Sequence, residues 1–358
     1  MVVGAVTGPI YDAGYFHELL ICGSFLVVFG HMMLSLCKVY YQALLAQAFC
    51  IGIGTGMLFV PSVAILSTYF NTKLAFAMGI AASGSSLGMQ PIYLKIILLG
   101  IGLIYIFAGG VIYPIVLYKL IPQIGFPWAV RTLGFIMLAT FLIPNTVMKV
   151  RVLPAKKRPL VDISAFKQPS YMLFTIGGVI AFLGLYVPFF YVQYYAIQQH
   201  ITDESLGFYL LSILNSASVF GRIIPNFLAD KTGPLNMIIP CATISGILIL
   251  CLIPVKSVAG VVVFCLLYGF FSGAFVSLPP TIIVHLSPNR GLIGTRMGMC
   301  FSMVAVGILV GTPIAGAILS RSGWTSVWVF GGVFTVGGGL LMTAGRAAYK
   351  GWNPMTKA

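Results

Sequence analysis

Long stretches of predominantly apolar residues, each long enough to cross a lipid bilayer, constrain the fold of this chain more than any other feature. Three of them are Leu19–Cys37, Met237–Val255 and Ser257–Ser277. A helix needs about 20 apolar residues to cross the hydrocarbon core. Because lipid offers the backbone no hydrogen-bond partner, such segments must be helices or strands of a closed barrel. Barrel strands alternate apolar and polar residues, and these stretches do not. The sequence therefore predicts an all-α membrane protein that has the lipid bilayer as a partner.

Charged residues are too few for a soluble protein. They make up 7% of the 358 residues, whereas soluble domains have about 25%. The net charge of +14 does not indicate nucleic-acid binding, because the basic residues stand in short segments between apolar stretches and form no large patch. The seven cysteines lie mostly within apolar stretches and have no paired spacing. They are typical of packing residues, so we expect no disulfide, metal site or cofactor.

Hydropathy, charges, prolines and glycines together predict where the spans begin and end. The expected spans are 1–11 (partial), 17–37, 41–68, 74–118, 127–150, 171–195, 207–228, 235–254, 258–284, 294–318 and 325–346. One long polar segment separates them into two groups, and its basic residues are Lys149, Arg151, Lys156, Lys157 and Arg158. This charge predicts a cytoplasmic linker at 151–170. The linker would join an N-terminal bundle at 1–150 to a six-helix C-terminal bundle at 171–346, with a cytoplasmic tail at 347–358.

Two similar turns, one in each group of spans, indicate an internal duplication. Gly8–Gly14 follows the first span, and Asn226–Gly233 follows the second span of the second group. Each turn places a carboxylate, Asp12 or Asp230, where the chain leaves the membrane, and a glycine follows two or three residues later. If the bundles correspond in this way, the first one lacks its first helix and part of its second.

These turns resemble the loop between helices 2 and 3 of the major facilitator superfamily, which has the pattern G-x-x-x-D-(R/K)-x-G. Asn226–Gly233 departs from the pattern at its first residue, and Gly8–Gly14 has Ala13 where a basic residue is usual. The run Tyr69–Gly88 resembles the start of helix 5 in the fungal monocarboxylate-transporter-like family, with Lys73 but without the usual arginine pair. Residues 220–230 resemble helix 8 of the same family, and residues 293–299 resemble the start of its helix 11.

The resemblance implies a major facilitator fold with two pseudo-symmetric helical bundles, here with the first helix missing. It also implies a secondary transporter that carries a small organic solute, with a monocarboxylate as the expected class, by rocking of the bundles around a midplane site. The plasma membrane or the vacuolar membrane is the expected location. A coupling proton is in question, because Gly221 stands where animal relatives have an aspartate. Those relatives also carry a substrate-linked lysine in helix 1, and no residue here takes its place.

The expected span at 74–118 is too long for a single crossing. Its roughly 45 residues would make a helix of about 68 Å, whereas the bilayer core is about 30 Å thick. Two crossings would reverse the orientation of every upstream span. Removal of 89–109 joins Gly88 to Gly110 and restores one helix of ordinary length. We interpret 89–109 as a translated intron, since Gly-Met can encode a GTATG donor and Ala-Gly a CAG acceptor. The alternative is a genuine hydrophobic insert.

Four residues are candidates for substrate binding. Arg222 lies inside an expected span, where a charge costs about 2.5–3.5 kcal/mol and needs a reason, and its planar fork suits a carboxylate. Its alternative role is pairing with a carboxylate at the helix end or snorkelling to the surface. Asn215 lies on the same helical face and could equally bond a neighbouring helix. Tyr191 belongs to an aromatic run around Pro188 that could form a substrate wall or an interfacial belt. Tyr113 is a weaker candidate.

Four further residues are candidates for a conformational switch. Asp12 and Asp230 stand at helix ends on the predicted cytoplasmic side. There they can bind cations or helix N-termini in one state and release them in the other. The cations of the two motifs, Lys73 and Lys231, complete this set. The alternative for Asp12 and Asp230 is that they are simply solvated loop residues.

Three functional hypotheses compete. The first is a working transporter of a small molecule. The second is a non-transporting product of a decayed or wrongly predicted gene, which the missing helix and the insert favour. The third is a membrane enzyme, which would need polar clusters at one membrane depth. Because the sequence shows no catalytic triad or carboxylate pair, and only six acidic residues, an enzyme is not expected.

Overall fold

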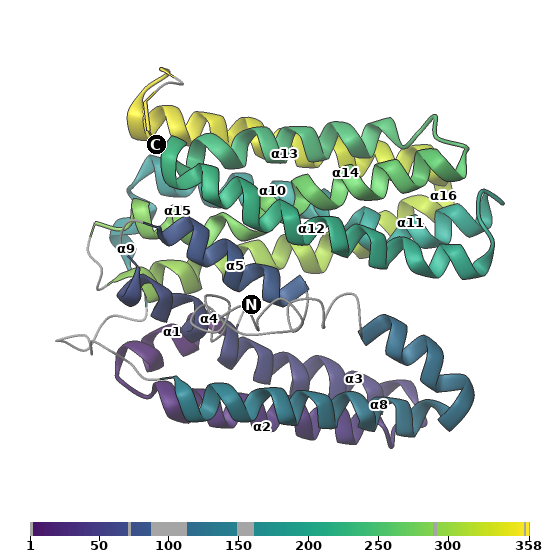
Figure 1. The fold of residues 1–358 in the computed structure, drawn as a ribbon. Coiled ribbons are helices and arrows are strands. Elements are labelled where there is room, and N and C mark those ends of the chain that lie inside the picture. Colours follow the sequence, from purple (N-terminus) through teal and green to yellow (C-terminus); the bar gives the residue numbers. More distant parts are fainter. Residues whose placement is uncertain are drawn as a thin grey trace. The chain divides into compact units, whose positions relative to one another are not determined.

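The computed structural model describes residues 3–70, 73–86, 113–148, 161–288, 292–353 and 356–357. Among these residues the regular structure is helical, with no strand, and eight helical segments are long and apolar enough to cross a membrane (Figure 1). The predicted all-α membrane fold is therefore confirmed. The proposed insert at 89–109 lies outside the described residues.

The chain divides into two compact units. The first unit contains Met1–Asn71, Leu87–Val161 and Ser287–Ser302, and the second contains Thr72–Ser86, Asp162–Leu286 and Met303–Ala358. A short segment from the first half of the sequence, 72–86, thus packs with helices of the second half. The predicted bundles, linker and tail stay predictions.

The first unit is built around a pair of closely packed helices. Its elements are α1 (Gly4–Asp12), α2 (Phe16–Leu34), α3 (Tyr40–Leu44), the π-helix η1 (Leu45–Ile51), α4 (Gly52–Tyr69), α8 (Tyr113–Val147) and the first residues of α16 (Ile293–Lys350). Small residues allow α2 and α4 to approach each other, as is usual in membranes: a methyl group on Gly54 would lie 2.9 Å from the Gly23 carbonyl oxygen. Gly125 breaks α8 with a φ of 76°, just before the predicted span 127–150.

The second unit holds the remaining helices. They are α5 (Leu74–Ser86), α9 (Ile163–Phe166), α10 (Pro169–Leu185), α11 (Val187–Gln198), α12 (Glu204–Thr232), α13 (Pro234–Cys251), α14 (Val258–Ser277), α15 (Pro279–Leu286) and the rest of α16. Side-chain oxygens satisfy free backbone N–H groups at several helix starts. Asp203 accepts from the Leu206 amide at 3.1 Å, and Ser257 accepts from the Gly260 amide at 3.2 Å.

Proline and glycine explain where the long spans of this unit bend. The predicted span 171–195 is divided into α10 and α11 next to Pro188, and the span 258–284 is divided into α14 and α15 next to Pro279. Proline lacks the N–H that would continue the helix. The predicted spans 294–318 and 325–346 both lie in α16, which is broken only by Gly323 at a φ of 75°.

Helices α12 and α14 pack backbone to backbone through glycine. A methyl group on Gly221 of α12 would overlap the Phe270 carbonyl oxygen. Methyl groups on Gly269 and Gly273 of α14 would similarly crowd the main chain of α12. Because only hydrogen fits at these positions, this contact requires glycine on both helices.

The end of α16 folds the chain back on the second unit, in an arrangement that we call the C-terminal clamp. Arg346, with 6% of its surface exposed, donates hydrogen bonds to Asn236 Oδ1 at 2.6 Å and to the Gly351 carbonyl oxygen at 2.7 Å. Its Nη2 also donates to the carbonyl oxygens of Asn353 and Thr356. One guanidinium thus holds the α13 start and the residues after α16 together.

Candidate functional site

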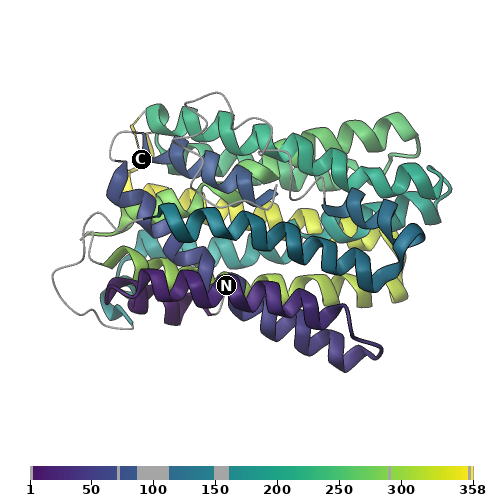
Figure 2. The ribbon, with the colours of Figure 1, turned by 60° about the horizontal axis from the view of Figure 1, so that its bottom comes forward.

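Helix α5 lies along α12 inside the second unit (Figure 1 and Figure 2). We call this contact the α5–α12 seam. It joins a segment near residue 80 to a segment near residue 226, so it brings the two halves of the sequence together. The residues that form it are Ala75, Phe76, Gly79 and Ala82 of α5 and Arg222, Asn226, Phe227 and Asp230 of α12.

At one end of the seam, the carboxylate of Asp230 binds the N-terminus of α5. Oδ1 accepts from the Ala75 amide at 2.9 Å, and Oδ2 accepts from the Phe76 amide at 3.0 Å. The first N–H groups of a helix have no partner within it, and the helix dipole favours a negative charge there. Asp230 therefore caps a helix that is about 155 residues away in the sequence, through two charge-assisted hydrogen bonds.

In the middle of the seam the two helices touch without intervening side chains. A methyl group on Gly79 would overlap the Arg222 carbonyl oxygen and would lie 2.6 Å from the Asn226 Cβ. Asn226 is fully buried, and its Nδ2 donates to the Arg222 carbonyl oxygen at 2.7 Å and to Ser277 Oγ at 2.6 Å. The hydrogen bond to Ser277 ties the seam to α14.

At the other end of the seam, the guanidinium of Arg222 holds α5 from the side. Only 8% of Arg222 is exposed. Its Nη1 donates to the Ala82 carbonyl oxygen at 2.5 Å, and its Nε donates to Ser218 Oγ at 3.2 Å. Burial of a cation is costly unless it is hydrogen-bonded. The hydrogen bonds to Ala82 and Ser218 therefore offset part of the cost of burying this guanidinium. In this conformation two of its acceptors are uncharged oxygens.

Aromatic rings gather near Arg222 at the break between α10 and α11. The Tyr186 side chain lies close enough to Arg222 for an electrostatic interaction. Its ring lies 5.4 Å from that of Phe189 and 5.8 Å from that of Phe182, between centroids. The Tyr268 hydroxyl donates to the Leu185 carbonyl oxygen. Sequence reasoning did not connect this cluster to Arg222, because Tyr186 and Arg222 lie on separate helices and no spacing rule relates them.

The other predicted substrate residues lie on three different helices, two of them in the second unit and one in the first. Asn215 is partly buried on α12, seven positions before Arg222. Tyr191 of α11 donates its hydroxyl to the Thr312 carbonyl oxygen of α16 at 3.0 Å. Tyr113 is the first residue of α8, in the first unit, and is partly buried. Their roles in binding stay predictions.

The predicted switch residues are described to different extents. Asp230 caps α5, and Lys231 is exposed with its Nζ 5.0 Å from the Phe227 ring centroid. Lys73 is exposed immediately before α5. Asp12 is the last residue of α1, and its side chain lies outside the described part of the chain. A switching role stays a prediction for all four.

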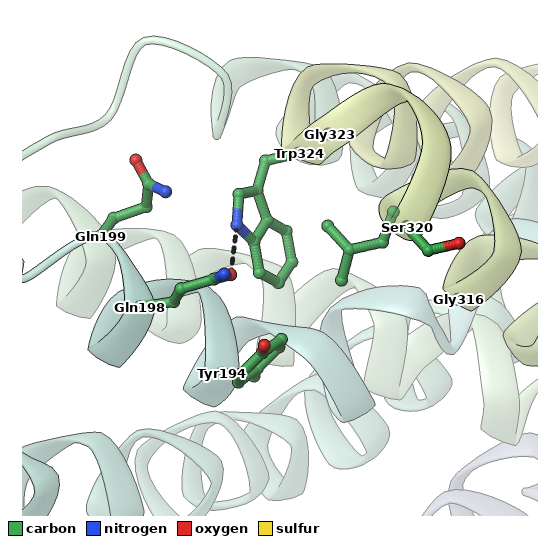
Figure 3. A pocket seen from close by; sticks show the side chains of 8 residues that line it. Tyr194, Gln198, Gln199, Gly316, Ser320, Gly323 and Trp324 are labelled. Carbon is green, nitrogen blue, oxygen red and sulfur yellow. Dashed lines mark hydrogen bonds between the residues drawn. The ribbon is translucent and has the colours of Figure 1, made fainter.

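A pocket of about 340 Å³ lies at the opposite end of the second unit from Asp230. Helix α11 ends there and leads into the start of α12, whose last turn carries Asp230. The residues that line the pocket are Tyr194, Gln198, Gln199, Gly316, Leu319, Ser320, Gly323 and Trp324 (Figure 3). Sequence analysis did not identify this pocket, although the glycine before Trp324 was a signal for a break in the chain.

Among the described residues, no group of three or more His, Cys, Asp or Glu side chains is placed to hold a metal ion.

Comparison with known proteins relates the whole chain to membrane transporters. The model of the Major Facilitator Superfamily matches residues 97–293 and 226–355. The chain is 50% identical to the MFS-type transporter dbaD of Emericella nidulans over 96% of this chain and 73% of that protein. It is 35% identical to the aspyridones efflux protein apdF of the same fungus, over 96% of this chain and 67% of that protein. With the fujikurins efflux protein of Gibberella fujikuroi it shares 36% identity, over 97% and 71%.

Solved structures agree with the sequence relatives. The fold superimposes with a TM-score of 0.70 on the Escherichia coli fucose:proton symporter FucP, with 13% identity, 96% of this chain and 87% of that chain covered. The human organic anion transporter MFSD10 gives a TM-score of 0.69 with 14% identity, over 95% and 81%. At such identities the similarity shows the fold alone. Together with the family match and the fungal relatives, it establishes that this chain is a multi-pass integral membrane protein of the major facilitator superfamily of transporters.

Proposed function

We propose that this chain is a secondary transporter that moves a small organic anion, of the monocarboxylate class, out of the cytosol by alternating access. The relatives named as efflux proteins support the direction. The observation that carries the proposal is the contact of Arg222 with the Ala82 carbonyl oxygen, because this partner can be exchanged for a substrate.

A carboxylate is a stronger partner for Arg222 than a peptide carbonyl. Hydrogen bonds between two charged groups are roughly twice as strong as neutral ones, and a guanidinium can bind both oxygens of a carboxylate at once. A substrate carboxylate that takes the place of the Ala82 oxygen would release one of the polar contacts that hold α5 in the described part of the chain. Binding of substrate would thereby favour a state in which the seam is open.

The contact of Asp230 with α5 affects the equilibrium between the closed and the open seam. Asp230 holds the N-terminus of α5 with two hydrogen bonds, and these must also break when α5 separates from α12. A ligand shifts such an equilibrium only by the difference between its affinities for the two states. Arg222 would supply this difference, whereas Asp230 would return the empty transporter to the closed seam. Lys73 and Lys231, on either side of that contact, would bind Asp230 in the open state.

Asn215, Tyr191 and Tyr113 are proposed as further residues that contact the substrate. A proton is the coupling ion that we propose to test first. In α12, however, Gly221 stands where animal relatives have an aspartate. The proposed location is the plasma membrane or the vacuolar membrane, with the linker and the C-terminus in the cytosol. Labelling of a cysteine placed at Lys156 in intact cells tests this orientation: reaction with an impermeant reagent would contradict it.

Uptake into proteoliposomes tests the anion site. Wild-type protein should take up labelled pyruvate or lactate, and Arg222→Ala should reduce the initial rate at least tenfold, because one charged partner of the carboxylate is lost. Arg222→Lys keeps the charge without the planar fork and should retain an intermediate rate. The control is Arg321→Ala, since Arg321 is exposed on α16. Unchanged uptake by a folded Arg222→Ala protein would refute the proposal.

A further inference from the structure

The pocket at the end of α11 has walls from two elements, α11 and α16. Tyr194, Gln198 and Gln199 come from the last turn of α11 and the residue that follows it, and the opposite wall comes from 316–324 of α16. Gly323 breaks α16 with a positive φ, which aims the next residue, Trp324, back toward α11 (Figure 3). The pocket therefore depends on the break in α16.

The indole of Trp324 is held rigidly before any ligand arrives. It stacks on Trp328 with a centroid separation of 5.6 Å and an angle of 18° between the planes, and Trp328 is only 1% exposed. The Tyr195 ring meets Trp324 edge-on at 5.1 Å. Trp324 Nε1 donates to Gln198 Oε1 at 2.9 Å, as the dashed line in Figure 3 shows. A ring that is already fixed loses little entropy when another ring packs on it.

The lining of the pocket is aromatic and polar but carries no charge. Its side chains supply an indole, a phenol, two primary amides, a hydroxyl and one leucine. Arg321 is the only charged residue in 316–324, and it is not among the lining residues. An anion would find no charged partner among these lining residues, whereas an uncharged ring can pack on the indole and the phenol. The lining thus selects for an uncharged molecule that offers a ring and hydrogen-bonding groups.

The volume suits a molecule of one or two rings. Pockets for small molecules start at about 300 Å³ and are lined by aromatic side chains with a few polar groups that fix orientation. Aromatic pairs contribute beyond the area that they bury, and the amides of Gln198 and Gln199 can meet a donor or an acceptor on the ligand.

We propose that this pocket is a second binding site, at the end of the second unit opposite to Asp230, for an uncharged aromatic solute with an amide or hydroxyl group. The inference goes beyond the proposed transport of a monocarboxylate, because the pocket would take an uncharged ligand that differs from the anion proposed for Arg222. It adds a ligand class that the Arg222 site does not define, namely an uncharged molecule with a ring system.

Direct binding to the purified full chain tests the proposal without the need for transport. The probes are 2-naphthamide, which is uncharged, and 2-naphthoate, which has the same rings and a negative charge. By calorimetric titration, 2-naphthamide should bind at least tenfold more tightly than 2-naphthoate. Trp324→Ala should weaken binding of 2-naphthamide about tenfold. Because this variant also removes contacts within the aromatic cluster, Ser320→Phe serves as a second variant that fills the pocket and should weaken binding as well.

Two control experiments distinguish binding at this pocket from binding at Arg222 and from occupation by lipid. Arg222→Ala should leave binding of 2-naphthamide unchanged while it reduces pyruvate uptake, so either proposal can fail alone. Equal affinity for the two probes, or unchanged binding in both pocket variants, would overturn the inference. Binding of 2-naphthamide in detergent that disappears in phospholipid nanodiscs would also overturn it, because lipid would then be the occupant.

Discussion

Helix α12 packs on two neighbours in two different ways. Against α14, glycines on both helices let the backbones touch, and Asn226 of α12 donates to Ser277 Oγ of α14. Against α5 only Gly79 allows a comparable approach, and charged side chains of α12 hold α5 on either side of it, Arg222 near one end and Asp230 at the other.

The difference predicts which of the two contacts can open. Glycine contacts gain only close packing, and no ligand or ion can take the place of a neighbouring backbone. The bonds at Arg222 and Asp230 join donors and acceptors that water, a substrate or a lysine can equally satisfy. We therefore expect the α14 face of α12 to be permanent and the α5 face to open and close.

The largest expected effect is that of Gly221→Ala on stability. The added methyl group would overlap the Phe270 carbonyl oxygen, and α14 can yield only by moving its backbone, at a cost of about 1–3 kcal/mol or more. The melting temperature in detergent should fall clearly. The control is Gly337→Ala, since a methyl group there meets no atom within 4 Å. Equal melting temperatures for the two variants would show that the α14 contact is not tight.

A smaller effect on stability, with a large one on transport, is expected for Gly79→Ala. Its methyl group would overlap the Arg222 carbonyl oxygen, but α5 can respond by moving away from α12. Pyruvate uptake should fall about fivefold or more, because the closed seam no longer forms, while the melting temperature changes little. Gly52→Ala, whose methyl group would lie 3.8 Å from the Gln47 carbonyl oxygen, should affect neither. A large loss of stability in Gly79→Ala would mean that both faces of α12 are permanent.

The smallest effect is expected for Asp230→Asn, which keeps the shape of the side chain and removes its charge. The interaction of a charge with a helix terminus is worth about 0.3–1 kcal/mol, so the open state should gain about two- to fivefold in population. Hydrogen–deuterium exchange of the backbone amides of 74–77 should accelerate by that factor. Asp203→Asn is the matched control, because Asp203 caps its own helix α12. Exchange that is unaltered by Asp230→Asn would exclude a role for its charge in holding α5.

Hydropathy alone predicted most of the helices, because the bilayer fixes both their length and their composition. The predicted span 207–228 lies within α12, and the span 235–254 overlaps α13 nearly throughout. The bends were less predictable: sequence did not show that residues 45–51 form a π-helix or that α16 continues to Gly323 without a loop. Such details depend on packing between helices rather than on transfer into lipid.

Sequence reasoning singled out two residues of the α5–α12 seam but not the groups that they contact. A charge inside an apolar span drew attention to Arg222, and a repeated turn drew attention to Asp230. Neither pattern could show that both residues hold α5, because pairing between remote segments leaves no periodic signal in one sequence. Trp324 was missed for a similar reason: aromatic residues near a helix end are usually explained by the interfacial belt, and only the fold shows that this one meets α11.

The C-terminal clamp has a consequence for how its sequence can vary. Arg346 recognises the residues after α16 chiefly through their main-chain oxygens, and every amino acid offers such an oxygen. Side chains in that stretch can therefore vary more readily than the arginine, except at Gly351, whose φ of 79° favours glycine. Related proteins compared position by position should show a variable terminus beside one retained cation and one retained glycine. Single substitutions at the other positions of this stretch would therefore have little effect in a genetic screen. Deletion of the stretch would instead leave the buried positive charge of Arg346 without the carbonyl oxygens that now accept its hydrogen bonds.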